Sequence, residues 1–454
     1  MLKSVMRVAG PLAALAAGLL MRDAGPGVAW TVAATTLCAL WWITEAVPIP
    51  VTALVPIALL PLAGAIPPEQ AARAVGDPLI LLLMGGFMLS TAMEKSGVHR
   101  RIALGMINLF GSGNGRRLVF GFMAAAALLS MWISNTATTL MLLPIAVAVI
   151  QGCDDKRLAL PLLLGMCYAA SIGGTGTPVG TPPNLIFMRV YQDSAGAEVG
   201  FTQWMQWALP IVLVMLPVAG LWLTRGLKLR SPVSLPATGA WSKAEVRTLV
   251  VFAITALLWV TRREPFGGWS GALGLTQAND GSVALLAVVA MFLVPNGSGA
   301  RLLDWKTAVG IPWGILLLFA GGICLAGAFS STGLSATIGE ALASYAGWPP
   351  WLLILLICLA VTFLTEITSN TATTSLLMPI LAAAAIAAGI EPRTIMVPAA
   401  ISASFAFMLP VATGPNAVVF SSGRLTVPQM AREGLVLNLL GALIISTISY
   451  FLLS

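Results

Sequence analysis

The chain has 454 residues, of which 58% are hydrophobic and only 9% are charged, and its mean hydropathy is +0.92. Soluble globular proteins carry about a quarter charged residues, so this composition excludes that class. Apolar runs extend from end to end and predict an all-α polytopic membrane protein in a lipid bilayer. The net charge of +7 follows from the excess of Lys and Arg in cytoplasmic loops, so we expect no nucleic-acid partner.

The first apolar segment, residues 8–21, follows Lys3 and Arg7 and could be a signal peptide. No small-residue cleavage site comes before Arg22, so we predict a retained first helix. The single histidine, His99, and five cysteines without metal-ligand spacing argue against a transition-metal site or a histidine relay.

The apolar residues 118–133 end at the polar sequence Ser-Asn-Thr of residues 134–136. These residue types favour turns and helix caps over helix interiors. A second apolar segment follows to about residue 150, and charged residues flank the pair at both ends. The pattern predicts a re-entrant hairpin with its tip at residues 134–136, where Ser and Asn can cap the second helix.

Residues 173–184 are rich in glycine and contain three prolines. Glycine is a poor helix former and proline has no N–H to donate, so a helix breaks here. Within a membrane such a break is tolerated only where it lines a cavity. A basic connector at residues 231–247 follows, and we expect it on the cytoplasmic side.

The hexapeptide Ser-Asn-Thr-Ala-Thr-Thr at residues 134–139 recurs at residues 369–374, and both copies continue into leucine, methionine and Pro-Ile. The Pro-Asn dipeptide that ends at Asn184 likewise has a counterpart that ends at Asn416. These matches share offsets between 232 and 236 residues and indicate a duplication. The second copy predicts a hairpin tip at residues 369–371 and a broken helix at residues 410–416.

Spans of about 20 residues divide the chain into about eleven transmembrane helices and two re-entrant hairpins, with a cytoplasmic N-terminus. Only six of the 24 Lys and Arg residues then lie outside: Arg22, Arg73, Arg189, Arg262, Arg263 and Arg393. An odd number of crossings separates the hairpins, which inverts the second repeat. We predict a first repeat at residues 1–230, the connector at 231–247 and a second repeat at 248–454. Inverted repeats with interrupted helices are typical of secondary transporters.

Four motifs together resemble the divalent anion:sodium symporter (DASS) family, the dicarboxylate, citrate and sulfate carriers. They are the paired Ser-Asn-Thr tips, Gly-Thr-Pro-Pro-Asn at 180–184, Leu-Pro-Val-Ala-Thr at 409–413 and Trp-Trp-Ile-Thr-Glu-Ala at 41–46. The resemblance extends over residues 36–420 and implies an elevator-type homodimer, with scaffold and transport domains each built from both halves. We expect it in the inner membrane of a bacterium. Gly414 departs from the family, which commonly has proline there.

The resemblance also implies the residues of the site. Two or more sodium ions would be the coupling ions, and two of them would have these ligands: Ser130, Ser134, Asn135, Gly180, Thr365, Thr368, Asn370 and Ala412. The substrate anion would contact these residues: Ser134, Asn135, Thr136, Thr181, Pro182, Asn370, Thr371, Thr413 and Gly414. Oxygen atoms suit a hard cation such as sodium. Since neither motif contains Lys or Arg, sodium ions and helix N-termini would neutralise the anion.

Three functions fit these patterns to different degrees. The first is sodium-coupled symport of a small divalent anion such as the C4-dicarboxylate succinate, with citrate and sulfate left open. The second is an anion exchanger or proton-coupled carrier of the same architecture, in which Glu366 takes part; Glu366 could equally be a structural partner. The third is an intramembrane enzyme, but Ser134 and Ser369 have no neighbouring base, so we expect no enzyme.

Overall fold

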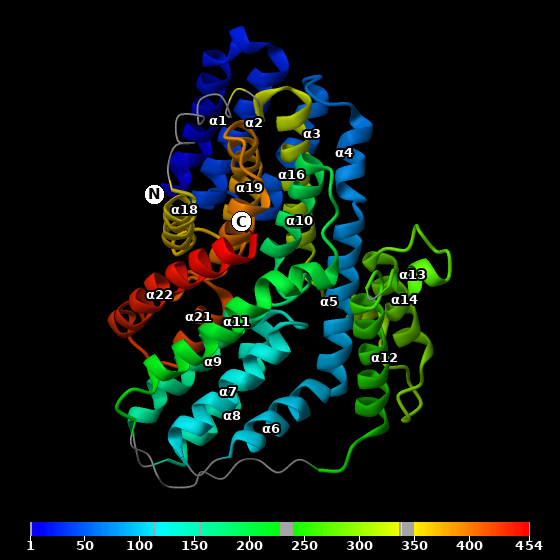
Figure 1. Cartoon of the computed structure of the whole chain (residues 1–454), viewed down its shortest axis with the longest axis vertical. Coiled ribbons are helices and arrows are strands. Elements are labelled where there is room, and N and C mark those ends of the chain that lie inside the picture. The colour runs from blue at the N-terminus through cyan, green and yellow to red at the C-terminus, as the bar shows by residue number, and fades with distance from the viewer. Residues whose placement is uncertain are drawn as a thin grey trace.

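The structure, a computed structural model, describes residues 2–111, 114–153, 156–227, 239–264, 266–335, 337 and 349–453. The helices of the first half are α1 (Leu2–Leu20), α2 (Pro26–Thr44), α3 (Ile49–Leu62), α4 (Pro68–Val75), α5 (Pro78–Ser96), α6 (Val98–Phe110), α7 (Gly115–Ser130), α8 (Asn135–Gln151), α9 (Ala159–Gly174), α10 (Pro182–Ala195) and α11 (Phe201–Leu223). Those of the second half are α12 (Lys243–Val260), α13 (Gly268–Ala272), α14 (Asp280–Leu293), α15 (Trp305–Ala308), α16 (Trp313–Ser331), α18 (Pro350–Thr365), α19 (Asn370–Ala387), α20 (Arg393–Ser402), α21 (Gly414–Phe420) and α22 (Val427–Leu453) (Figure 1). Residues 231–238 of the predicted connector lie outside the described residues.

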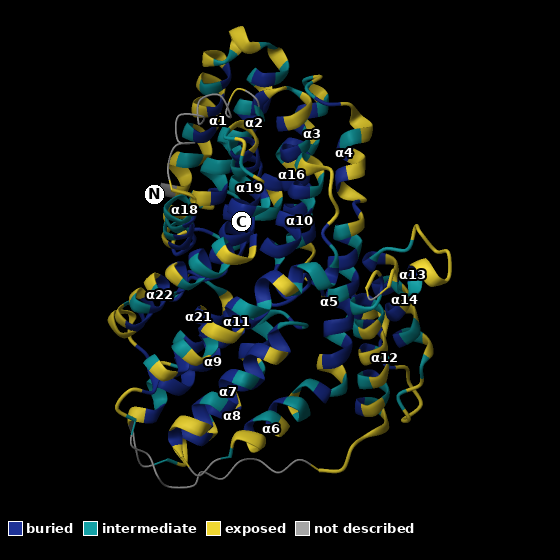
Figure 2. Cartoon of the chain, viewed as in Figure 1, coloured by how far each residue is buried: buried dark blue, intermediate teal, exposed yellow. Residues whose placement is uncertain are grey.

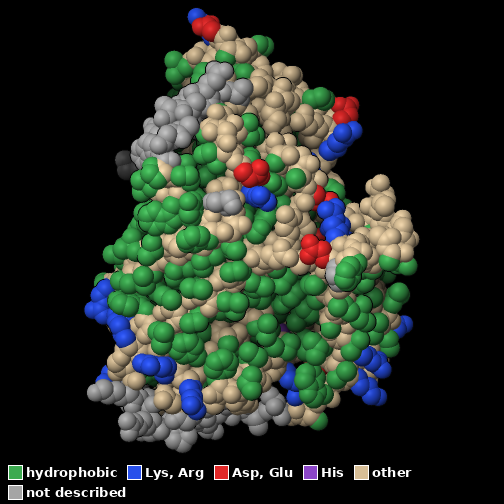
Figure 3. Space-filling model, viewed as in Figure 1, with side chains coloured by type: hydrophobic (Ala, Val, Ile, Leu, Met, Phe, Trp, Pro, Cys, Tyr) green, Lys and Arg blue, Asp and Glu red, His purple; other side chains and the backbone are tan. Residues whose placement is uncertain are grey.

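Helices make up all the regular structure of the described ranges, apart from short 3-10 turns and one isolated bridge between Pro295 and Arg301. Seven helical stretches in these ranges are long and apolar enough to cross a membrane: Lys3–Leu20, Pro26–Thr44, Pro68–Ser96, Phe201–Leu223, Trp313–Ser331, Asn370–Ala387 and Val427–Leu453. The predicted all-helical membrane fold is confirmed, whereas the number of eleven crossings stays a prediction. Figure 3 shows hydrophobic side chains over the middle of the visible face, with Lys and Arg gathered along its lower edge.

The two predicted hairpins are pairs of helices joined by a short turn. Helix α7 ends at Ser130 and α8 begins at Asn135, while α18 ends at Thr365 and α19 begins at Asn370. Ser134 caps α8, because its hydroxyl accepts a 3.1 Å hydrogen bond from the backbone N–H of Ala137. The equivalent Ser369 makes no such bond to α19. The predicted serine cap is therefore correct in the first hairpin and wrong in the second.

Both broken helices are present, but their boundaries differ from those expected. The first is interrupted at residues 175–181, between α9 and α10, within the predicted range. The second is unwound from residue 403 to residue 413, so its break begins earlier than the predicted residue 410. The reason is that side chains, not preceding carbonyls, accept hydrogen bonds from the N–H groups of Phe407, Met408 and Leu409.

Helices of the two halves pack on each other in a reciprocal pattern. Helix α5 packs on α14 of the second half, and its repeat counterpart α16 packs on α3 of the first. In the same way α10 contacts α19, and α21 contacts α8. Helix α9 lies at the centre and is buried continuously from Pro161 to Gly174, whereas α1 is mostly exposed (Figure 2). Each broken helix is thus held against the hairpin of the other half.

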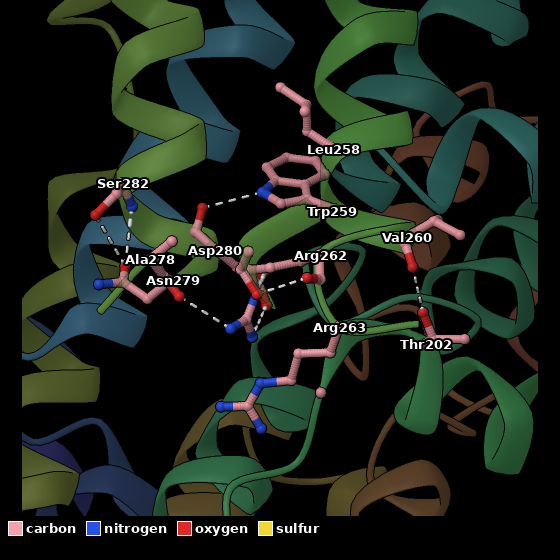
Figure 4. Close-up of polar contacts among 12 residues, drawn as sticks. Thr202, Leu258, Trp259, Val260, Arg262, Arg263, Ala278, Asn279, Asp280 and Ser282 are labelled. Carbon is pink, nitrogen blue, oxygen red and sulfur yellow. Dashed lines mark hydrogen bonds and ion pairs between the residues drawn. The ribbon is translucent and has the colours of Figure 1, made fainter. Parts of the chain in front are cut away.

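A buried ion cluster ties the end of α12 to the start of α14 and to the loop after α10 (Figure 4). Arg262 is only 4% exposed, and it donates to Asp280 through Nε at 2.6 Å and through Nη2 at 3.2 Å. Its Nη2 also donates to Glu198, which pairs with Arg263 as well. The indole N–H of Trp259 donates to the Asp280 carbonyl at 3.0 Å. The cluster fixes the junction of three segments distant in sequence.

We expect Asp280→Ala to lower the free energy of unfolding by about 3 to 5 kcal/mol, because it leaves the buried charge of Arg262 short of its main partner. Thermal unfolding of the purified protein in detergent measures the effect. The control is Asp23→Ala, which removes a carboxylate that is 92% exposed and pairs only with exposed Arg22; such a pair contributes little. Equal melting temperatures for the two variants would contradict the prediction.

Candidate functional site

Each hairpin tip carries the same hydrogen bond between a hydroxyl and an asparagine. In the first tip, Ser130 Oγ donates to Asn135 Oδ1 at 2.5 Å. In the second, Thr365 Oγ1 donates to Asn370 Oδ1 at 2.7 Å, and the same hydroxyl lies 2.9 Å from the carbonyl oxygen of Ala403. The repeated hexapeptide therefore folds into two equivalent clusters of side-chain oxygen atoms.

The first break is held open by Asn184, which is fully buried near the start of α10. Its Nδ2 donates to the carbonyls of Gly174 and Thr177, at 3.1 and 2.7 Å. The indole N–H of Trp204 donates to the carbonyl of Thr175 at 2.8 Å. These bonds replace those that the interrupted helix lacks, as buried backbone groups require.

The second break uses the equivalent asparagine and a carboxylate. Asn416 Nδ2 donates to the carbonyls of Ala406 and Leu409, at 3.1 and 2.9 Å. Glu366 accepts the backbone N–H groups of Met408 and Leu409, at 2.8 and 3.0 Å. It also accepts from Asn438 Nδ2 at 2.7 Å. Both breaks are thus rigid, hydrogen-bonded segments that present backbone carbonyls beside the hairpin tips.

A pocket of about 730 Å³ lies where the two tips and the two breaks meet. Its wall includes every residue predicted to contact the anion, and six of those predicted to bind sodium: Ser134, Asn135, Gly180, Thr368, Asn370 and Ala412. Ser130 and Thr365 do not line the pocket and lie behind it, bonded to the tip asparagines. The fold therefore brings together residues from four separate segments, and their binding roles stay predictions.

The rest of the wall comes from the N-terminal helices and from α16. Trp42, Thr44 and Glu45 contribute at the end of α2, and Ile49 and Phe87 follow from α3 and α5. Glu45 is the one charged residue among the described residues of the wall. It has the left-handed backbone conformation (φ +46°), and its carboxylate pairs with Lys3 at 3.1 Å. The pocket therefore contains no Lys or Arg from the described ranges that could neutralise an anion.

The electrostatics of the pocket come from helix ends instead. Helices α8, α10 and α19 all begin at residues that line it, namely Asn135, Pro182 and Asn370. The N-terminus of a helix carries a partial positive charge and free N–H groups, which favour an anion. Hydroxyl, amide and carbonyl oxygens beside them are the donors that a hard monovalent cation prefers. The wall can therefore bind both an anion and a cation without a Lys or Arg side chain.

Two glycines are required by close approach. A side chain at Gly414 would overlap the hydroxyl of Thr136 from the opposite half. A side chain at Gly180 would overlap the carbonyl oxygen of Gly174 inside the first break. Glycine in place of proline at position 414 therefore lets the second break pack directly on the first hairpin tip.

Asn184, Asn416 and Asn438 were not among the residues predicted to form the site. The first two carry a signal that could have identified them, because the Pro-Asn dipeptide occurs in both halves. Asn438 on α22 carries none, since its bonds to Glu366 and Phe407 join segments far apart in the chain. In the described ranges no three His, Cys, Asp or Glu residues form a metal-binding cluster.

The apolar helical fold and a polar pocket between interrupted helices define a polytopic membrane transporter. The model of the citrate transporter family (CitMHS) matches residues 39–394. The chain is 37% identical over 450 residues to the sodium-dependent dicarboxylate transporter SdcS of Staphylococcus aureus strain MRSA252, covering 93% of this chain and 86% of that protein. SdcS of strain USA300 matches to the same extent.

Among solved structures, the crystal structure of the Alcanivorax borkumensis YdaH transporter, described as having an unusual topology, is similar with a TM-score of 0.58. The two are 16% identical, and the match covers 84% of this chain and 87% of that one. This likeness shows a shared fold. The chain belongs to the divalent anion:sodium symporter family, as its motifs predicted, and it is a transporter and not an enzyme.

Proposed function

We propose that this protein is a sodium-coupled symporter of a small divalent anion, namely a C4-dicarboxylate such as succinate. The observation that carries the proposal is the pair of equivalent hydroxyl–asparagine bonds, Ser130–Asn135 and Thr365–Asn370, at opposite sides of one pocket. Each pair places oxygen atoms beside unwound carbonyls. The relatives SdcS are named as sodium-dependent dicarboxylate transporters, which supports the same coupling ion and class of substrate here.

In this proposal one sodium ion binds at each tip, and the anion binds between them. Ser130, Ser134, Asn135 and the carbonyl of Gly180 hold the first ion, and the second ion has these ligands: Thr365, Thr368, Asn370 and the carbonyl of Ala412. The anion contacts the tips and the starts of α10 and α21. Without sodium the anion would meet only partial positive charges from helix ends, so the two bind together.

The proposed movement is that of an elevator. The transport domain would consist of the hairpins α7–α8 and α18–α19 and the broken helices. The other helices of both inverted repeats would form the scaffold. The reciprocal packing of the two halves supports this division. We further propose a homodimer in a bacterial inner membrane, with the N-terminus and the basic edge of Figure 3 in the cytoplasm, following the positive-inside rule.

The test is uptake of radiolabelled succinate into proteoliposomes under an inward sodium gradient, compared with equal potassium. Uptake that requires sodium supports the symporter. Uptake without a sodium response, only into vesicles preloaded with a dicarboxylate, would instead establish an exchanger and remove the sodium roles of Ser130 and Thr365. If succinate is not taken up under either condition, citrate and sulfate are assayed in the same way.

For the proton-coupled alternative, the relevant residue is Glu366. We expect Glu366→Gln to leave the shape of the pH profile of uptake unchanged, because the carboxylate is occupied by three hydrogen-bond donors and so does not carry a proton through the cycle. The profile is measured at saturating sodium, with wild-type protein in parallel. A flattened profile in a variant of normal size-exclusion behaviour would favour proton coupling.

A further inference from the structure

The two halves of the site differ in the three residues between the tip hydroxyl and the Ser-Asn pair, which are Met-Trp-Ile at 131–133 and Glu-Ile-Thr at 366–368. In each hairpin, one residue follows directly after the hydroxyl residue that bonds the tip asparagine: Met131 follows Ser130, and Glu366 follows Thr365. The first half therefore has a neutral thioether where the second has a carboxylate. Of the three differing pairs, only Met131 and Glu366 differ by an ionisable group, and the hexapeptides that follow are identical.

Glu366 is almost completely buried, with 3% of its surface exposed. Its partners are two backbone N–H groups of the second break and the amide of Asn438, all neutral donors. None of the ion pairs between described residues includes Glu366. A buried carboxylate that lacks a Lys or Arg partner is unfavourable by itself, so a cation bound close to it is correspondingly favoured.

The first break is held by neutral groups only. Thr177 Oγ1 donates to the carbonyl of Met131, while Asn184 and Trp204 donate to the carbonyls of the break. A cation at this half is attracted by dipoles alone. At the second half the unwound segment that leads to Ala412 is bonded directly to the carboxylate of Glu366. Charges inside a protein interact more strongly than in water, so the two halves cannot bind a cation equally well.

We infer that Glu366 is a positioning residue that makes the two cation half-sites unequal, so that the second half-site binds sodium more tightly and fills first. The inference rests on the proposed function, since it assumes one sodium ion at each tip. It also assigns an order to the binding: the ion at the second tip precedes the ion at the first, and the anion site is complete only after both.

The first experiment measures sodium binding without transport. The melting temperature of the purified protein in detergent is followed against sodium chloride, with choline chloride keeping the ionic strength constant. We expect Glu366→Gln to raise the sodium concentration at half-maximal stabilisation by about tenfold, equivalent to about 1.4 kcal/mol. Glu366→Asp, which keeps the charge, should stay within about threefold of wild type. An unchanged midpoint in Glu366→Gln, or equal shifts in both variants, would overturn the inference.

Uptake kinetics separate an effect of charge from damage to the fold. At saturating sodium, the KM for succinate in Glu366→Gln should stay within about twofold of wild type, while the half-saturating sodium concentration rises. A purely structural role would raise both. Wild-type protein that shows no stabilisation by sodium would refute the proposed symport itself. A sodium response in wild type with no change in Glu366→Gln would refute only the inequality of the half-sites.

A second measurement does not depend on any variant of Glu366. Asn135→Ala leaves only the half-site that contains Glu366, and Asn370→Ala leaves only the neutral one. We expect sodium to stabilise Asn135→Ala with a midpoint at least about tenfold lower than for Asn370→Ala. Equal midpoints, or the reverse order, would show that the carboxylate does not decide which half-site fills first.

Discussion

Asn135→Ala and Asn370→Ala should each reduce sodium-driven succinate uptake by about 100-fold. Each removes an amide oxygen that accepts a hydroxyl hydrogen bond and lines the pocket. A buried polar group left without its partner costs about 1 to 3 kcal/mol, and the proposed cation loses a ligand in addition. Because both ions are needed to complete the anion site, loss of either half is enough to stop the cycle.

The measurement is initial uptake into proteoliposomes over a range of sodium concentrations. Asn108→Ala is the matched control, because Asn108 is exposed on α6 and does not line the pocket. The control should transport like wild type. Normal uptake with unchanged sodium dependence in both tip variants would show that the ions bind elsewhere.

Gly180→Ala should abolish uptake and also lower the melting temperature. The added methyl group would overlap the backbone carbonyl of Gly174, which cannot move aside because Asn184 holds it. Forcing extra atoms into a packed interior typically costs about 1 to 3 kcal/mol. Here the distortion also displaces the carbonyl of Gly180 itself, which is proposed to bind the first ion. The effect on uptake should therefore exceed the effect on stability.

Gly200→Ala provides the comparison, since it adds the same methyl group where no atom of the protein lies within 4 Å. Gly200 precedes α11 and has an ordinary negative φ of −78°, so alanine fits its backbone. Uptake and melting temperature are measured for both variants. If Gly180→Ala transported succinate like Gly200→Ala, the first break would be more adaptable than its hydrogen bonds indicate.

Much of the site was predictable because its motifs occur in both halves of the chain. The two tips were located from residue types that do not suit a helix interior. The structure places the turns slightly earlier, at residues 131–134 and 366–369, because Asn135 and Asn370 already begin α8 and α19. The first break was recognised from glycine and proline. The second break was placed too late, because residues 403–409 are mainly apolar or small and contain no proline. In the structure the acceptors Glu366 and Asn438 bond the N–H groups of residues 407–409, which keeps this part of the chain out of a helix.

The serine caps show the same limit to prediction from the sequence. Ser134 and Ser369 each begin the same hexapeptide, yet only Ser134 bonds the next helix. The sequence of a tip cannot specify this difference, because the orientation of a hydroxyl depends on the neighbours that the rest of the fold supplies. The close approach of Gly414 to Thr136 is likewise a contact between halves, and the chain alone gives no reason for it.

The class of protein, its family, the approximate positions of the two tips and the nature of the candidate ligands follow from the amino-acid sequence. Those properties depend on composition, on the conformational preferences of single residues and on a duplication, all of which can be read along the chain. The enclosure of one pocket by four segments, the hydrogen bonds by which Asn184 and Asn416 hold the breaks open, and the contact of Glu366 with the second break became known from the structure. Those properties depend on contacts between residues that are up to hundreds of positions apart in the chain. The hydrogen bonds and the burial of these residues exist only once the fold has brought them together.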